Sequence, residues 1–190
     1  MPPMPRRPLI RTIGHSTRAL DAFVALLRAH RVARLVDVRT IPRSRRHPQF
    51  NRENLADDLG TAGIAYAHMA GLGGLRRPRA DSINTGWRNA GFRGYADYMQ
   101  TPEFEAALER LVALARGERV AIMCAEAVPW RCHRSLIADA LTARDVRVEH
   151  ILAVDRAESH RLTAFARIEA GGVTYPAPGP LDLPFETPRG

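Results

Sequence analysis

Short apolar runs alternate along the chain with longer amphipathic stretches. The runs have the length of buried strands, and they cover Leu9–Ile13, Arg34–Val38, Ile64–Met69, Val120–Met123 and Val146–Leu152. Between them apolar residues recur at the spacing of a helix face, around Phe23, Leu55, Tyr95, Phe104 and Leu136. Strands that alternate with helices predict a mostly parallel sheet covered on both faces. We therefore expect an α/β three-layer sandwich of Rossmann-like type, with about five strands.

Helix start signals accompany several of these stretches. Thr101 followed by Pro102 is typical of a helix N-terminus. Ser16 or Thr17 is expected to cap the first helix, and Asn51 is expected to cap the second. These signals place helix starts directly after polar residues.

The C-terminal third is expected to end in a helix and a tail. Asp155 with Glu158 resembles a capping pair, which predicts a last helix through Phe165. From Gly171 the chain is too rich in Pro and Gly for regular structure. We therefore expect a single α/β domain over residues 1–170 and a Pro/Gly-rich tail over 171–190.

The composition is that of a soluble globular protein. The chain has 190 residues, 45% of them hydrophobic and 25% charged, which suits one domain with a proper core. No apolar run approaches the roughly 20 residues that cross a bilayer, and the N-terminus lacks the pattern of a signal peptide. We expect a cytoplasmic protein without a membrane partner, whose two cysteines are reduced.

The charge favours an anionic partner. The formal net charge is +8, and all 28 basic residues are arginine. Guanidinium groups suit phosphate and carboxylate recognition, although an arginine-biased genome would give the same composition. The charge alone does not separate a small anionic ligand from a nucleic acid.

Polar residues that could bind a ligand or take part in a reaction follow the predicted strands. In an open α/β sheet, ligands bind beyond the carboxyl ends of the strands, so we expect these residues to meet at one edge. The residues are His15 and Ser16 after the first strand, Asp37, Arg39 and Arg45 after the second, His68 after the third, and Cys124 and Glu126 after the fourth.

The segment from Arg119 to Leu141 is the predicted centre of the site. It runs from a strand through a polar loop into a helix, whose first amide N–H groups and dipole favour an anion. His133 and Arg134 would oppose that dipole unless an anion lay between them. The predicted anion-binding set is Ser16, Arg39, Arg45, Cys132, His133 and Arg134.

Four residues are candidates for catalysis. Cys124 is a candidate nucleophile and Glu126 a candidate acid or base, with His15 and Asp37 as partners. A structural role is an open alternative for each, since a cysteine that ends an apolar strand is often a small core residue. The cysteines lie eight positions apart, which matches no common zinc motif. No metal site is predicted, and no cofactor is indicated.

The stretch of residues 70–93 is long and irregular, and such loops are usually functional or mobile. Arginines interleaved with aromatic residues can follow a phosphate backbone and stack on bases. The predicted loop contacts are Arg76, Arg77, Trp87 and Arg88. A solvated loop that closes over a small ligand is the alternative interpretation.

With these residues in view, the chain resembles the family called domain of unknown function 488. The resemblance rests on six motifs, TIGHS at 12–16, LVDVR at 35–39, PRSR at 42–45, LGG at 72–74, GYADYM at 94–99 and MCAE…CHR at 123–134. It implies a single α/β domain with these positions as its site, and it names no reaction.

Three functional hypotheses follow. The first is an enzyme that acts on a small phosphorylated or nucleotide-like anion at the Cys, Glu, His and Arg site. The alternatives are a protein that binds or processes nucleic acid through the basic loop, and a non-catalytic domain that binds an anionic effector. The oligomeric state is not predicted.

Overall fold

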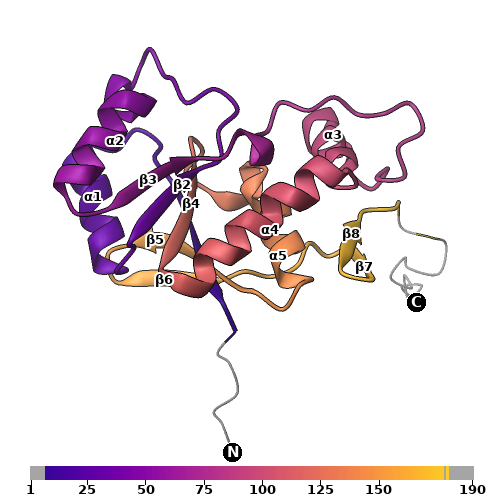
Figure 1. Ribbon diagram of the computed structural model, residues 1–190. Coiled ribbons are helices and arrows are strands. Elements are labelled where there is room, and N and C mark those ends of the chain that lie inside the picture. The colour runs from indigo at the N-terminus through magenta and orange to yellow at the C-terminus, as the bar shows by residue number, and fades with distance from the viewer. Residues whose placement is uncertain (1–6, 178, 180–190) are drawn as a thin grey trace, which may run out of the picture.

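A six-stranded mixed sheet forms the centre of the computed structural model, which describes residues 7–177 and 179 (Figure 1). The strand order is β3-β2-β4-β1-β5-β6. The first five in this order are parallel, and β6 pairs with β5 in antiparallel fashion. The bounds are β1 Leu9–Gly14, β2 Arg34–Asp37, β3 Ala65–His68, β4 Val120–Cys124, β5 Arg147–Ala153 and β6 Arg156–Ser159.

Helices cover both faces of the sheet and complete the three layers. One face packs against α1 (Leu20–Ala29) and α2 (Arg52–Thr61), and the other against α3 (Ala90–Tyr98), α4 (Pro102–Gly117) and α5 (Arg134–Thr142). Short 3-10 turns lie at Pro48–Phe50, Ala70–Leu72 and Pro129–Arg131. The predicted α/β sandwich is confirmed, with one strand more than expected in the main sheet.

The sequence of β4 explains its central position. Ala121 and Met123 belong to the apolar cluster under α1 and α2, whereas Ile122 and Cys124 belong to the cluster under α4 and α5. Successive side chains of a strand point to opposite faces. A strand covered on both sides therefore reads as an unbroken apolar run.

Of the predicted helix N-caps, one is confirmed and the others differ in the structure. Thr101 caps α4 as expected, since its Oγ1 accepts a hydrogen bond from the Phe104 N–H at 3.3 Å. The predicted cap at Ser16 or Thr17 is wrong, because α1 begins at Leu20 after Ala19, and Ser16 adopts a φ of 50° in the turn after β1. Asn51 does precede α2, but its side chain accepts from the Ser44 N–H instead.

The predicted last helix is wrong. Residues 156–159 form β6, which pairs with the edge strand β5. Farther on, β7 (Arg167–Glu169) and β8 (Gly172–Thr174) form a separate hairpin. The apolar positions that suggested a helix are weakly buried, with Leu162 40% and Ile168 44% exposed, so no helix face was available to hold them in the core.

We expected no regular structure after Gly171, but Gly172–Thr174 form the strand β8. The side chain of Tyr175, just beyond it, is fully buried. Residues 1–6, 178 and 180–190, which include most of the predicted tail, lie outside the described residues. Among the helices of the described part, none has the length and apolar character to cross a membrane.

Candidate functional site

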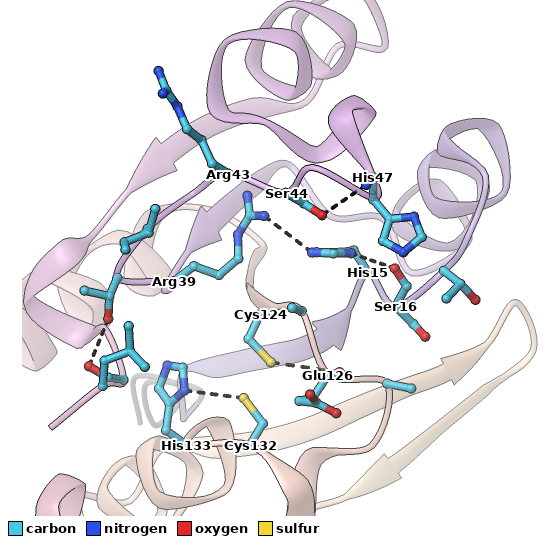
Figure 2. A pocket seen from close by; sticks show the side chains of 17 residues that line it. His15, Ser16, Arg39, Arg43, Ser44, His47, Cys124, Glu126, Cys132 and His133 are labelled. Carbon is cyan, nitrogen blue, oxygen red and sulfur yellow. Dashed lines mark hydrogen bonds between the residues drawn. The ribbon is translucent and has the colours of Figure 1, made fainter. Parts of the chain in front are cut away.

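The carboxyl ends of β1, β2 and β4 are neighbours, and a pocket of about 520 Å³ lies beyond them (Figure 2). Its walls come from the segments after these three strands, from Gly74 and Leu75, and from the turn that leads into α5. Of the predicted site residues, the pocket brings together His15, Ser16, Arg39, Cys124, Glu126, Cys132 and His133.

Cys132 and His133 form a thiol–imidazole pair at the pocket wall. The Cys132 Sγ lies 3.4 Å from His133 Nδ1, and His133 Nε2 lies 3.0 Å from the carbonyl oxygen of Val38. Because a carbonyl oxygen only accepts, Nε2 carries the hydrogen and Nδ1 holds a lone pair. The thiol can therefore donate its proton to Nδ1, which is the arrangement of a nucleophile beside its base.

Gly74 allows the loop to approach this pair. A Cβ at this position would lie 3.0 Å from His133 Nδ1, a distance that a side chain could occupy only if the imidazole moved. The LGG motif therefore bears directly on the position of the imidazole.

Arg134 contacts the sulfur atoms of both cysteines. Its Nε donates to Cys124 Sγ at 3.0 Å, and its backbone N–H donates to Cys132 Sγ at 3.5 Å. The hydrogen bond with Cys124, assisted by Arg134, lowers the pKa of Cys132 to about 7, whereas burial raises the pKa of Cys124. Negative charge on the pair is therefore favoured on Cys132.

Both terminal nitrogens of Arg134 also donate to protein atoms. Its Nη1 donates to Thr12 Oγ1 at 3.1 Å and its Nη2 donates to the carbonyl of Glu126 at 2.7 Å. The side chain is 1% exposed and does not line the pocket. Arg134, which we expected to bind an anion, lies inside the protein and holds the loop after β4.

A hydrogen-bonded chain leads from Arg134 to a buried carboxylate. Thr12 Oγ1 lies 2.7 Å from His150 Nδ1, His150 Nε2 lies 3.0 Å from His160 Nδ1, and His160 Nε2 lies 2.7 Å from Asp139 Oδ1. Burial lowers the pKa of His150 to about 4, so this imidazole is neutral near pH 7. One consistent assignment has every group donate toward Asp139, which also accepts from the Tyr175 hydroxyl at 2.8 Å.

His15 contributes a neutral acceptor to the pocket. Its ring stacks on Phe50 at a centroid distance of 4.3 Å, and Nδ1 donates to the Ser16 carbonyl at 2.8 Å. Nε2 therefore holds the lone pair, 3.4 Å from Arg39 Nη1. Burial lowers the pKa of His15 to about 4, so the ring stays uncharged near neutral pH.

Asp37 lies behind the pocket and positions Arg39. Its carboxylate is fully buried and accepts from Arg39 Nε at 2.9 Å and Nη2 at 2.6 Å, and from the Tyr66 hydroxyl at 2.8 Å. Arg39 also donates to the Phe50 carbonyl at 2.7 Å. Arg39 lines the pocket while Asp37 does not.

Two basic residues that the sequence reasoning missed lie at the pocket. Arg43 is exposed and His47 is half-buried, and both line the cavity, whereas the predicted Arg45 is exposed elsewhere. The Arg- and Pro-rich composition of residues 39–50 was the available signal, but composition alone does not tell which side chain of a loop points inward. Glu126 is exposed and lines the same pocket.

The side chains of residues 70–93 do not form one continuous surface. Arg76 stacks on the Tyr98 ring at 3.6 Å and donates to the Gly73 carbonyl, while Arg77 and Arg88 are exposed. Trp87 packs against Tyr175 instead, away from the first pocket. The four predicted loop contacts therefore lie in different environments.

Trp87 lines a second cavity of about 780 Å³, together with Pro129, Trp130, His150 and His160. The segment after β4 separates the two cavities, since residues 125–127 line the first and residues 129–130 line the second. Within the described residues, His, Cys, Asp and Glu side chains do not gather in threes that could hold a metal ion.

The comparisons with known proteins identify a family. A family model described as Domain of unknown function DUF488 matches residues 19–141, which is more than half of the chain. Neither the curated proteins nor the solved structures give a match. The matched segment runs from the start of α1 through β4 to α5, and so spans the turn with Cys124, Cys132 and His133. The chain belongs to the DUF488 family of domains of unknown function.

Proposed function

We propose that this protein is an enzyme that uses Cys132 as a nucleophile on a small anionic substrate. The observation that carries the proposal is the thiol–imidazole pair, in which Cys132 Sγ lies 3.4 Å from the His133 Nδ1 acceptor at the wall of a pocket. This keeps the substrate class expected from the sequence and moves the role of nucleophile from Cys124 to Cys132. Cys124, which is 2% exposed and bonded to Arg134, assists it.

The pair suits transfer of an acyl group. His133 Nδ1 takes the thiol proton, and the sulfur attacks the electrophilic carbon of the substrate. A carbon–sulfur bond forms, the bond to the leaving group breaks, and the leaving group takes the proton from His133. Water then releases the acyl group, with the carboxylate of Glu126 as base, since it lines the pocket.

The basic residues of the pocket select an anionic substrate. Arg43, which is exposed, and His47 line it, whereas Arg39 is paired with Asp37 at the back of the pocket. A guanidinium group pairs well with a carboxylate or phosphate, and the net charge of +8 attracts anions toward the protein. A cytoplasmic location, expected from the sequence, belongs to this proposal because thiols stay reduced there.

The state of the loop arginines favours a small substrate over the nucleic-acid alternative. Arg77 and Arg88 are exposed, but three other loop arginines are engaged by the protein, since Arg76 stacks on Tyr98, Arg79 pairs with Asp81, and Arg93 donates to the Trp87 carbonyl. Side chains held in this way have fewer donors free for a phosphate backbone.

Alkylation with iodoacetate and iodoacetamide tests the proposal without a known substrate, because the two reagents differ in charge. We expect Cys132 to be alkylated first, with a rate that rises through a pKa of about 7. We expect iodoacetate to be favoured over iodoacetamide by about fivefold relative to a free thiol, the factor for roughly 1 kcal/mol of attraction. Peptide mass spectrometry locates the modified sulfur.

Variants separate the two parts of the proposal. Arg43→Gln should abolish the preference for iodoacetate, and Arg45→Gln is the matched control because Arg45 is exposed and does not line the pocket. A Cys132 that reacts only above pH 8.5 would rule out its role as nucleophile. If iodoacetate were still preferred in that case, the domain would be an effector-binding protein without catalysis.

A further inference from the structure

The two cysteines share the floor of the pocket. Figure 2 shows the sulfur atoms of Cys124 and Cys132 pointing toward one another, one from the end of β4 and the other from the turn before α5. Both are free thiols that line the cavity, and Arg134 donates a hydrogen bond to each. The two thiols also share a hydrogen bond, so their sulfur atoms are within reach of one another.

We propose that Cys124 and Cys132 form a reversible disulfide when a hydroperoxide enters the pocket. The site is then one of oxidative modification, with Cys132 as the sulfur that is oxidised first and Cys124 as the one that resolves it. The inference rests on the proposed function in one respect, namely that Cys132 is the reactive thiol.

The first step oxidises Cys132. Its thiolate attacks one oxygen of the peroxide, a sulfur–oxygen bond forms, and the oxygen–oxygen bond breaks. The departing hydroxide or alkoxide takes the proton that His133 received from the thiol, since His133 Nδ1 lies 3.4 Å from the sulfur. Cys132 becomes a sulfenic acid, and the peroxide is reduced to water or an alcohol.

The second step joins the two sulfurs. Cys124 attacks the sulfur of the sulfenic acid, the sulfur–oxygen bond breaks, and the hydroxide leaves as water with the proton of Cys124. Arg134 Nε, at 3.0 Å from Cys124 Sγ, stabilises the thiolate that forms in this step. Both sulfurs are similarly buried, at 2% and 5% exposure, but burial raises the pKa of Cys124, so its thiol stays protonated and reacts more slowly with the oxidant than Cys132 does.

The disulfide removes the proposed nucleophile and can be reversed. A dithiol reductant restores both thiols by exchange, and is itself oxidised to a disulfide. The modification would therefore switch the site off under oxidising conditions and protect Cys132 from sulfinic acid formation.

The test treats the full-length reduced protein with hydrogen peroxide and quenches it with an alkylating agent. We expect a mass loss of about 2 Da, the two hydrogens that leave when a disulfide forms, and its recovery with dithiothreitol. Trypsin cuts after Arg131 and Arg134. A non-reduced digest should therefore show the peptide of residues 120–131 linked to that of residues 132–134.

Two variants assign the order of events. In Cys124→Ala we expect the cross-link to disappear and dimedone, which traps sulfenic acid, to label Cys132. In Cys132→Ala we expect no label on Cys124 at the same peroxide concentration. If Cys124→Ala does not fold, the linked peptide in the wild-type protein still decides whether the disulfide forms.

Over-oxidation of Cys132 without a cross-link, or no reaction with peroxide, would overturn the inference. The alkylation rate of Cys132 in the same reduced sample keeps this result separate from the proposed function. A fast alkylation without a cross-link removes only the disulfide, whereas a slow alkylation removes the nucleophile as well.

Discussion

Gly14 allows the end of β1 and the loop after β4 to meet. A Cβ at Gly14 would lie 1.7 Å from the carbonyl oxygen of Glu126 and 3.0 Å from Arg134 Nη2. That carbonyl is the one that accepts from Arg134 at 2.7 Å. The glycine of the TIGHS motif is therefore required by the contact that fixes Arg134.

Substitution of this glycine gives a first prediction. Gly14→Ala should lower the free energy of unfolding by more than about 4 kcal/mol, because backbone and a buried arginine must both move. Gly60→Ala is the control, since Gly60 lies in α2 with no atom within 4 Å of its added Cβ, and it should stabilise by about 0.5–1 kcal/mol. Urea denaturation measures both, and equal stabilities of the two variants would contradict the packing described.

Much of the pocket could be predicted at the level of single residues. The rule that ligands bind beyond parallel strand ends placed His15, Arg39, Cys124 and Glu126 together, and the structure brings them to one cavity. The inward orientation of Arg134 could not be predicted, because it depends on carbonyls of a loop and on Thr12, which is 122 positions away.

Elements with internal signals were predictable, and elements that depend on distant partners were not. The helix α4 has its cap, its proline and its apolar face within one segment. The strand β6 has four residues and forms because the edge of β5 accepts it. Its sequence carries a pattern that also resembles a helix cap, and only the pairing decides between them.

Tyr175 anchors the segment after β8 in the core. Tyr175 is fully buried, its hydroxyl donates to Asp139 Oδ2 at 2.8 Å, and its backbone N–H donates to Asn84 at 2.8 Å. Asp139 is the carboxylate at which the chain from Arg134 ends. Tyr175 is thus bonded to the hydrogen-bonded chain that leads from Asp139 to Arg134, the residue that contacts both thiols.

Removal of this hydroxyl gives a second prediction. Tyr175→Phe should lower the free energy of unfolding by about 1.5–3 kcal/mol, the range for a hydrogen bond to a charged group. Tyr98→Phe is the matched control, because its hydroxyl donates to the uncharged carbonyl of Gly71 and should cost about 0.5–1.5 kcal/mol. Thermal or urea unfolding of both variants makes the comparison, and a smaller cost for Tyr175→Phe would argue against an ionised Asp139.

Over the whole molecule, the alternation of strands and helices predicted the class of the fold but not the order of its strands. The chain places β4 between β2 and β1, although β4 follows both in sequence. This insertion brings Cys124 next to the ends of β1 and β2, and it arises from pairings between segments about 85–110 positions apart. Local periodicity carries no information about such pairings.

Several buried histidines make the stability of the molecule depend on pH. Burial lowers the pKa of His15 and His150 to about 4 and also lowers that of His133. The unfolded chain binds these protons near pH 6.5 and the folded chain does not. The stability is therefore fully present above about pH 6.5 and falls as the pH drops toward 4, by up to about 1.4 kcal/mol per pH unit for each histidine.

The third prediction is a fall of the urea midpoint between pH 7.5 and pH 5. His15→Phe keeps a ring that can stack on Phe50 and removes one titrating group, so its stability should fall less steeply over the same range. A midpoint independent of pH in the wild-type protein would mean that these histidines bind protons equally well in both states.

The segment of residues 125–130, which lies between the two cavities, carries a tryptophan whose fluorescence can report on ligand binding. The chain contains two tryptophans. Trp130, which is 67% exposed, lies on this segment, while Trp87 is packed among the rings of Phe165 and Tyr175. Ligand entry into the first cavity that shifts residues 125–127 also shifts the indole three residues farther along. Trp130 is thus an intrinsic fluorophore next to the first cavity. Ligand binding to that cavity can therefore be followed by tryptophan fluorescence without an added dye.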